Sequence, residues 1–143
     1  MELNIIYDKE HKEEILIYAH EKNSLVTEIE ELVEKSYKEL LGYRNDEIIK
    51  LSVKDVVCFT VESGKVYAIC GNTRLQIKQR LYQLEEMLDK SFVKINQSTI
   101  ANIKKIDRFN ASLQGSLMVI FKNGYKDYVS RRQMKIVKER IGF

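Results

Sequence analysis

Two adjacent arginines, Arg131 and Arg132, stand where a helix is expected to begin, in the sequence Ser130-Arg131-Arg132-Gln133. Ser130 and Gln133 have the spacing of a capping box, in which both side chains bond backbone amides of the first turn. Cations are mildly disfavoured at this end of a helix, because the backbone dipole leaves partial positive charge there, whereas anions are favoured. Two arginines at such a point indicate that an external anion, such as a phosphate, binds beside them.

A second group of polar side chains follows the apolar run Phe92-Val93-Lys94-Ile95. This group is Asn96, Gln97 and Ser98, and apolar residues resume after it. Amide side chains can donate to phosphates or bond the edge of adenine. The pattern by itself does not decide whether this triplet contacts a ligand or only solvent.

Both groups also have structural interpretations that need no ligand. Arg131 and Arg132 could form ion pairs with Asp127 or Glu139. The polar triplet could occupy the solvent side of a half-buried strand. The sequence pattern by itself leaves these alternatives open.

The net charge of +3 is unevenly divided along the chain. Residues 1–45 carry 6 Lys/Arg against 11 Asp/Glu, and residues 46–143 carry 18 Lys/Arg against 10 Asp/Glu. Such asymmetry indicates that the C-terminal part meets a polyanion while the N-terminal part has another role. The alternative is that both parts simply present solvated charge.

The residues that catalysis, metals or cofactors require do not occur in suitable patterns. His11 and His20 lie outside any cluster with metal-ligand spacing, and no phosphate-binding glycine loop is present. Cys58 and Cys70 lie on strand-like runs and are expected to be small, reduced core residues. With no signal peptide and no run near ~18 apolar residues, the sequence predicts a cytoplasmic protein that is not an enzyme.

Residues 1–45 are expected to form two strands and a helix. The alternation of Leu3, Ile5 and Tyr7 and the apolar run over 15–19 predict a β-hairpin. Ser24 is the expected N-cap of an amphipathic helix whose apolar stripe runs from Leu25 to Leu40. This stripe is expected to pack either on its own hairpin or on a second copy of the chain.

Residues 46–143 are expected to form an α+β domain, mainly β with short helices. Strands are predicted over 48–51, 56–61, 66–70 and 73–77, twice within 92–106, and over 116–121 and 125–129. Helices are predicted around 81–88 and from 131 onward. Asn123-Gly124 predicts a hairpin with a type I′ turn, which needs positive φ at both central residues.

Residues 46–143 resemble the LytTR-type DNA-binding domain family. The resemblance lies in the segment 92–103, in Asn123-Gly124 followed by Tyr128-Val129-Ser130-Arg131-Arg132, and in the segments 55–59 and 81–85. It implies a domain of small antiparallel sheets with short helices. It also implies loops that enter successive major grooves of DNA, commonly at direct repeats in bacterial promoters.

The resemblance implies a set of DNA contacts: Lys65, Asn96, Gln97, Ser98, Arg131 and Arg132. Ser63 lies near the first of these. Gln97 departs from the family pattern, which usually has Lys or Arg at that position, so it adds no charge there.

The sequence therefore predicts a bacterial transcription regulator that binds specific double-stranded DNA. Residues 1–45 are too few for a phosphoacceptor receiver domain, and they are expected to join two copies into a homodimer. The resemblance adds a small membrane protein as a possible regulatory partner. The alternative is a protein-interaction module whose basic face binds an acidic partner or a membrane surface.

Overall fold

The structure, a computed structural model, describes residues 2–36, 39–111 and 115–143. It divides into two compact units, Met1–Val33 and Glu34–Phe143. The second unit therefore begins before residue 46, where the domain boundary was expected.

The first unit contains one helix and no strand among its described residues. The predicted hairpin over residues 3–19 is wrong, because residues 2–23 form neither helix nor strand. Alternating apolar residues form a stable strand only where a partner strand and a covering face exist. Here the apolar side chains stay exposed: Ile6 is 87% exposed, Tyr7 94% and Tyr18 92%.

Helix α1 (Ser24–Ser36) is capped by Asn23 rather than by Ser24. Asn23 Oδ1 accepts a hydrogen bond of 3.0 Å from Val26 N, and Asn23 O accepts one of 3.1 Å from Thr27 N. Leu40, which was assigned to the stripe of this helix, instead lies on a strand of the second unit and is 3% exposed.

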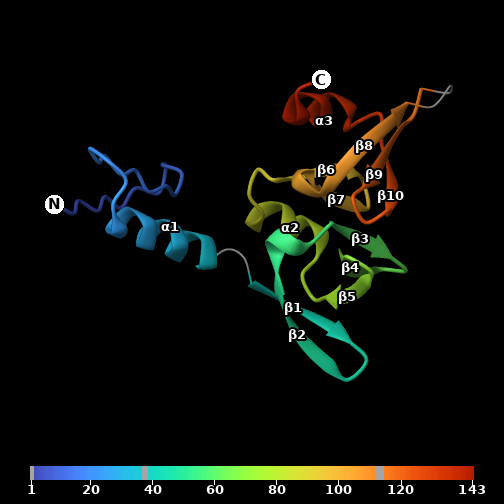
Figure 1. Ribbon diagram of the computed structural model, residues 1–143, viewed down its shortest axis with the longest axis horizontal. Helices are drawn as coiled ribbons and strands as arrows, with labels where there is room; N and C mark the ends of the chain where they lie inside the picture. The colour runs from blue at the N-terminus through green and yellow to red at the C-terminus, as the bar shows by residue number, and fades with distance from the viewer. Residues whose placement is uncertain (1, 37–38, 112–114) are drawn as a thin grey trace. The chain divides into compact units, whose positions relative to one another are not determined.

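The second unit is built around a seven-stranded antiparallel sheet, called sheet A, in the order β2-β1-β5-β4-β3-β7-β6 (Figure 1). Its strands are β1 (Glu39–Arg44), β2 (Glu47–Ser52), β3 (Cys58–Glu62), β4 (Lys65–Cys70), β5 (Thr73–Ile77), β6 (Phe92–Asn96) and β7 (Thr99–Asn102). A three-stranded antiparallel sheet, called sheet B, has the order β10-β9-β8. Its strands are β8 (Ile106–Ala111), β9 (Leu117–Phe121) and β10 (Lys126–Val129).

Helices α2 (Leu81–Met87) and α3 (Met134–Ile141) complete the second unit, with short 3₁₀ turns over Val53–Asp55 and Ile103–Lys105. The part of sheet A formed by β3, β7 and β6 is buried on both faces. Phe59 packs with Leu84 of α2 in one core, and the adjacent Cys58 packs with Val137 of α3 and with sheet B in the other. Because side chains alternate along β3, this strand contributes residues to both cores.

Strand β1 can lie against β5 because residue 42 is glycine. A Cβ at this position would stand 2.7 Å from Leu75 Cδ1, closer than side chains tolerate. The pairs Gly42–Ile77 and Tyr43–Gln76 join the two strands. The β1–β2 hairpin is thereby attached to the rest of sheet A.

The β9–β10 hairpin is confirmed, but its predicted turn type is wrong. Gly124 N donates to Phe121 O at 2.9 Å, and Gly124 has φ +88°. Asn123 does not share this left-handed conformation. The connection is therefore a type I turn followed by a left-handed glycine, the three-residue form of hairpin loop.

The predicted capping box at the last helix is also wrong. Helix α3 begins at Met134, and its N-cap Gln133 makes no side-chain capping bond. Ser130 N donates to Ile95 O at 2.8 Å, so this residue is tied to sheet A. Arg131 and Arg132 consequently lie in a turn before the helix and not in its first helical turn.

Candidate functional site

The turns β3–β4 and β6–β7 lie side by side at one end of sheet A. Thr60 pairs with Thr99 where β3 runs antiparallel to β7, and Val61 N donates to Ser98 O at 2.8 Å. The end of β3 is therefore adjacent to the start of β7. Lys65, which directly follows the first turn, and the Gln97–Ser98 turn face solvent at the same end.

The turn between β10 and α3 is bonded to this same end. Besides the bond from Ser130 to Ile95, Asn96 Nδ2 donates to Tyr128 O at 2.9 Å. Arg131 and Arg132 follow directly and are exposed. The structure thus brings together three turns, called the three-turn end: residues 62–65, 97–98 and 130–133.

A polar network inside the protein fixes these turns to one another. Asp127 Oδ1 accepts from Asn96 Nδ2 at 3.0 Å, and Asp127 Oδ2 accepts from Thr99 Oγ1 at 2.7 Å. The Thr99 and Thr60 hydroxyls lie 3.1 Å apart, and Ser98 N donates to Asn96 Oδ1 at 2.8 Å. Buried polar groups that are fully bonded in this way rigidify the structure around them.

The predicted contact residues occupy two different environments. Lys65, Gln97, Ser98, Arg131 and Arg132 are exposed. Asn96 is only 3% exposed, and its side-chain amide forms hydrogen bonds within the protein. The geometry accordingly gives Asn96 a role in positioning the Gln97–Ser98 turn.

The arginines of the three-turn end keep their charge available. Among the described residues neither Arg131 nor Arg132 forms an ion pair, so the pairing with Asp127 or Glu139 is absent there. Asp127 is instead occupied by Asn96 and Thr99. Two free guanidinium groups beside an exposed lysine and an exposed amide can bind an extended anion such as a nucleic-acid backbone.

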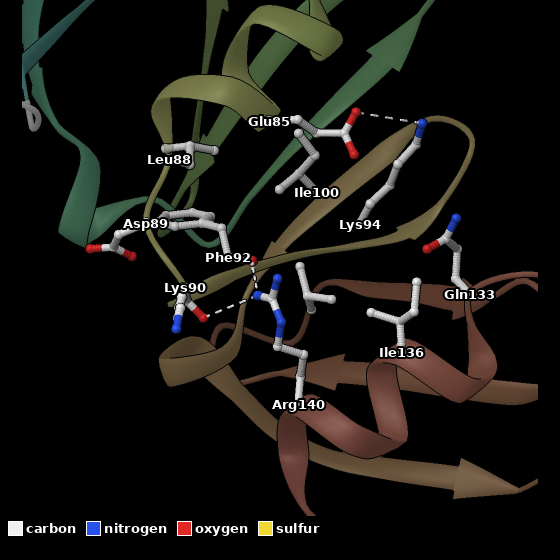
Figure 2. A pocket seen from close by; sticks show the side chains of 11 residues that line it. Glu85, Leu88, Asp89, Lys90, Phe92, Lys94, Ile100, Gln133, Ile136 and Arg140 are labelled. Atoms are coloured by element: carbon white, nitrogen blue, oxygen red, sulfur yellow. Dashed lines mark hydrogen bonds and ion pairs between the residues drawn. The ribbon is translucent and has the colours of Figure 1, made fainter. Parts of the chain in front are cut away.

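Helix α3 is anchored so that the turn at its start is held in place. Arg140 Nη1 donates to Phe92 O at 3.0 Å and to Lys90 O at 3.4 Å. Figure 2 shows this guanidinium reaching from α3 to the backbone that enters β6. The hollow around it, of about 320 Å³, lies between α2, β6 and α3, and Lys94 and Glu85 form an ion pair of 3.9 Å across its rim.

Sequence reasoning did not identify the residues that position the site. Thr60, Thr99 and Arg140 act through partners at least 28 residues away in sequence, and local spacing does not reveal such pairs. The available signal was weak: a polar threonine at the start of β7, directly before Ile100 and Ala101.

The cysteines do not form a reactive site. Burial raises the pKa of the Cys58 thiol far above its ordinary value, with a further rise from Asp127. Burial also raises the pKa of Cys70 to about 11, helped by Asp55. Both thiols are therefore protonated at neutral pH and are poor nucleophiles. In the described part of the chain, no group of His, Cys, Asp or Glu is arranged to hold a metal ion.

Comparison with known proteins identifies the domain that carries the three-turn end. A family model described as the LytTr DNA-binding domain matches residues 46–142. The chain belongs to the LytTR family. The resemblance found in the sequence and the mainly antiparallel fold expected from it are both confirmed.

Two relatives of the LytTR chain extend over its whole length. An uncharacterized HTH-type transcriptional regulator of Staphylococcus aureus strain MSSA476 is 34% identical, over 99% of this chain and 98% of the relative. A protein with the same description from strain NCTC 8325 is 33% identical over the same shares. These relatives therefore share the N-terminal unit as well as the LytTR domain.

A solved structure shares the fold. The LytTr DNA-binding domain of a methyl-accepting/DNA response regulator from Bacillus cereus matches with a TM-score of 0.70 and 20% identity, over 74% of this chain and 98% of that chain. The family match begins at residue 46, directly before β2, so β1 lies outside it. Among the described helices, none has the length and apolar character needed to cross a membrane.

Proposed function

We propose that the protein is a transcription regulator that binds specific sites in double-stranded DNA through the three-turn end. The observation that carries this proposal is the set of bonds that join the three turns, above all those of Asp127 with Asn96 and Thr99. Together they form one rigid surface bearing three exposed cations and an exposed amide. Family membership and relatives described as transcriptional regulators support the same function.

The dimensions of the three-turn end suit a DNA groove. Adjacent strands lie about 4.8 Å apart, so the centres of the β3–β4 and β6–β7 turns are roughly 10 Å apart along sheet A. DNA rises 3.4 Å per base pair along each strand. The two turns therefore span about three base pairs, and the arginine turn extends the contact further.

In this proposal, each exposed cation and the exposed amide has its own role in DNA binding. An arginine can bond a guanine edge in bidentate fashion or bind a phosphate. The amide of Gln97 can bond adenine, and Lys65 supplies charge to the backbone. Asn96 acts from inside by holding the Gln97–Ser98 turn.

We further propose that the N-terminal unit joins two copies on a repeated promoter site. Helix α1 exposes Leu25 by 42% and Leu32 by 66%, and Ile29 lies on the same stripe. A unit of about 33 residues rarely stabilises itself without a disulfide, a metal or a partner chain, and residues 1–45 contain no cysteine. Two copies on two repeats would also multiply the specificity of a small contact.

Competition binding tests the proposed function against the alternative of a merely basic interaction module. The wild-type protein selects duplexes from a random-sequence library, and a selected duplex is then titrated in the presence of excess random DNA. Sequence-specific binding should survive this competition. A basic surface without base recognition would lose all binding under the same conditions.

A further inference from the structure

The exposed lysine of the three-turn end has a neighbour of like charge on the next strand. Val66, the residue after Lys65, pairs with Ile77 in the antiparallel β4–β5 ladder. Lys78 follows Ile77, so it stands beside Lys65 at the same end of sheet A. Both lysines are exposed.

A third lysine continues this line across β1 to β2. Gly42 of β1 pairs with Ile77, which places Leu41 beside Lys78. Leu41 in turn pairs with Lys50 of β2. Lys65 of β4, Lys78 directly after β5 and Lys50 of β2, called the lysine row, therefore stand at corresponding positions of neighbouring chain segments.

The lysine row faces the same side of sheet A as sheet B and the arginine turn. Side chains alternate along a strand, so Lys65 shares its face with Tyr67 and Ile69. Ile69 is buried in the core that includes sheet B and α3. The row thus continues the three-turn end on the side where Arg131 and Arg132 lie.

The charges of Lys78 and Lys50 are free, and Lys78 is held in place. Lys78 Nζ lies 4.7 Å from the centre of the Tyr43 ring, and such contacts attract a cation without neutralising it. Arg74, which lies over Tyr67, is different because it forms an ion pair with Glu62. Neither Lys78 nor Lys50 forms an ion pair among the described residues.

We propose that Lys78 and Lys50 bind phosphates of the DNA that flanks the bases reached from the Lys65 turn. This inference rests on the proposed function and extends its site along sheet A to Lys78 and Lys50, both within the family match; Tyr43 beside Lys78 lies on β1, outside that match. Three strand spacings of about 4.8 Å separate Lys65 from Lys50. The row therefore extends the contact by roughly four base pairs on one flank. These contacts act through charge on the phosphates and do not recognise bases.

The charge-matched control for this proposal lies at the opposite end of the sheet. Asn123 Nδ2 donates to Gly71 O at 2.8 Å, which places the β9–β10 turn beside the β4–β5 turn, away from Lys65. Lys122 and Lys126 belong to that hairpin and are exposed. A Lys122→Ala/Lys126→Ala variant removes the same charge as Lys50→Ala/Lys78→Ala.

The test measures the salt dependence of binding and the footprint on a duplex selected by the wild-type protein. Each lost phosphate contact lowers the slope of log K against log salt by about 0.9. Lys50→Ala/Lys78→Ala should therefore lower it by roughly 2 and shorten the hydroxyl-radical footprint on one flank only. The base preference should stay unchanged, and the control variant should match the wild type in slope and footprint.

A second pair of variants tests the role of Tyr43. Tyr43→Phe keeps the ring and should leave the slope of log K against log salt unchanged. Tyr43→Leu removes the ring and should lower this slope, but by less than Lys78→Ala does. If the wild type binds a selected duplex and both lysine double variants share its slope and footprint, the proposal is overturned while the proposed function stands. If the wild type selects no duplex, the proposed function itself fails, and the lysine row fails with it.

Discussion

Thr99 Oγ1 donates a 2.7 Å hydrogen bond to Asp127 Oδ2, and this bond joins β7 of sheet A to β10 of sheet B. Thr99 is 1% exposed, so water cannot replace its partner. Because β7 begins at the Gln97–Ser98 turn and β10 leads to Arg131 and Arg132, this bond and those of Asn96 to Asp127 and Tyr128 set the relative position of two parts of the site.

Removing this hydroxyl should destabilise the protein. Thr99→Val keeps the shape of the side chain but leaves a carboxylate oxygen of Asp127 without its donor, which should cost about 1–3 kcal/mol of unfolding free energy. Thr99→Ser keeps the hydroxyl and should lose only about 0.8 kcal/mol for the missing methyl group. Urea unfolding measures the unfolding free energy of both variants. A Thr99→Val protein as stable as the wild type would show that the bond contributes nothing.

Substitutions of Arg132 should show whether this residue recognises a base or binds the DNA backbone. If it bonds a guanine edge, Arg132→Ala should lose about 1–3 kcal/mol of discrimination at one base pair, and Arg132→Lys should keep the charge but not the discrimination. If it binds a phosphate, affinity should fall evenly for all sequences, with a drop of about one in the salt slope. Titrations at several salt concentrations decide this. Unchanged affinity and slope would mean that this turn does not face DNA.

Gln97 should respond to added charge. Gln97→Lys places a cation on the exposed turn and should strengthen binding to all DNA with a steeper salt dependence. If the amide of Gln97 bonds a base, Gln97→Ala should weaken binding to the selected duplex more than binding to random DNA. Should both variants match the wild type on both duplexes, this turn lies outside the contact surface.

The apolar stripe of α1 should determine whether the protein is a dimer or a monomer. Ile29→Glu/Leu32→Glu should shift sedimentation from dimer to monomer, and it should weaken binding to two repeats far more than to one. Glu28→Ala/Glu31→Ala on the polar face serves as the control and should leave the dimer intact. A wild-type protein that sediments as a monomer and occupies two repeats independently would contradict this prediction.

The thiols should react slowly until the protein unfolds. With its pKa raised from 9.0 to about 11, Cys70 has a roughly 100-fold smaller thiolate fraction than an unperturbed cysteine near pH 8. Iodoacetamide should therefore label the native protein far more slowly than the urea-unfolded one. Because folding raises the pKa, the unfolding free energy should fall as pH rises above 9. Equal labelling rates in both states would refute the protonated state of the thiols.

The parts of the fold that local sequence determines were predictable. The β3–β4 and β9–β10 hairpins follow from Gly64 and Gly124, each of which has positive φ, between apolar runs. The α2 helix follows from its leucine spacing. Strand β8 was missed, because Asp107, Arg108 and Asn110 give it a polar, exposed face that reads as a loop.

The errors arose where distant residues decide the structure. Leu40 fits a helical stripe in sequence, but it is buried on β1 because Gly42 lets that strand pair with β5. Ser130 looks like a helix cap, yet its amide is bonded to Ile95, far away in the chain. The burial of Asn96 could likewise not be predicted from local sequence, because its partner Asp127 lies 31 residues further on.

Amide chemical shifts measured during titration with a selected duplex test most directly whether the three turns form one DNA-binding surface. The largest shifts are expected in residues 62–65, 97–98 and 130–133, with the β4–β5 and β9–β10 turns at the opposite end nearly unchanged. Largest shifts around Gly71 and Asn123, with the three turns unaffected, would contradict this expectation.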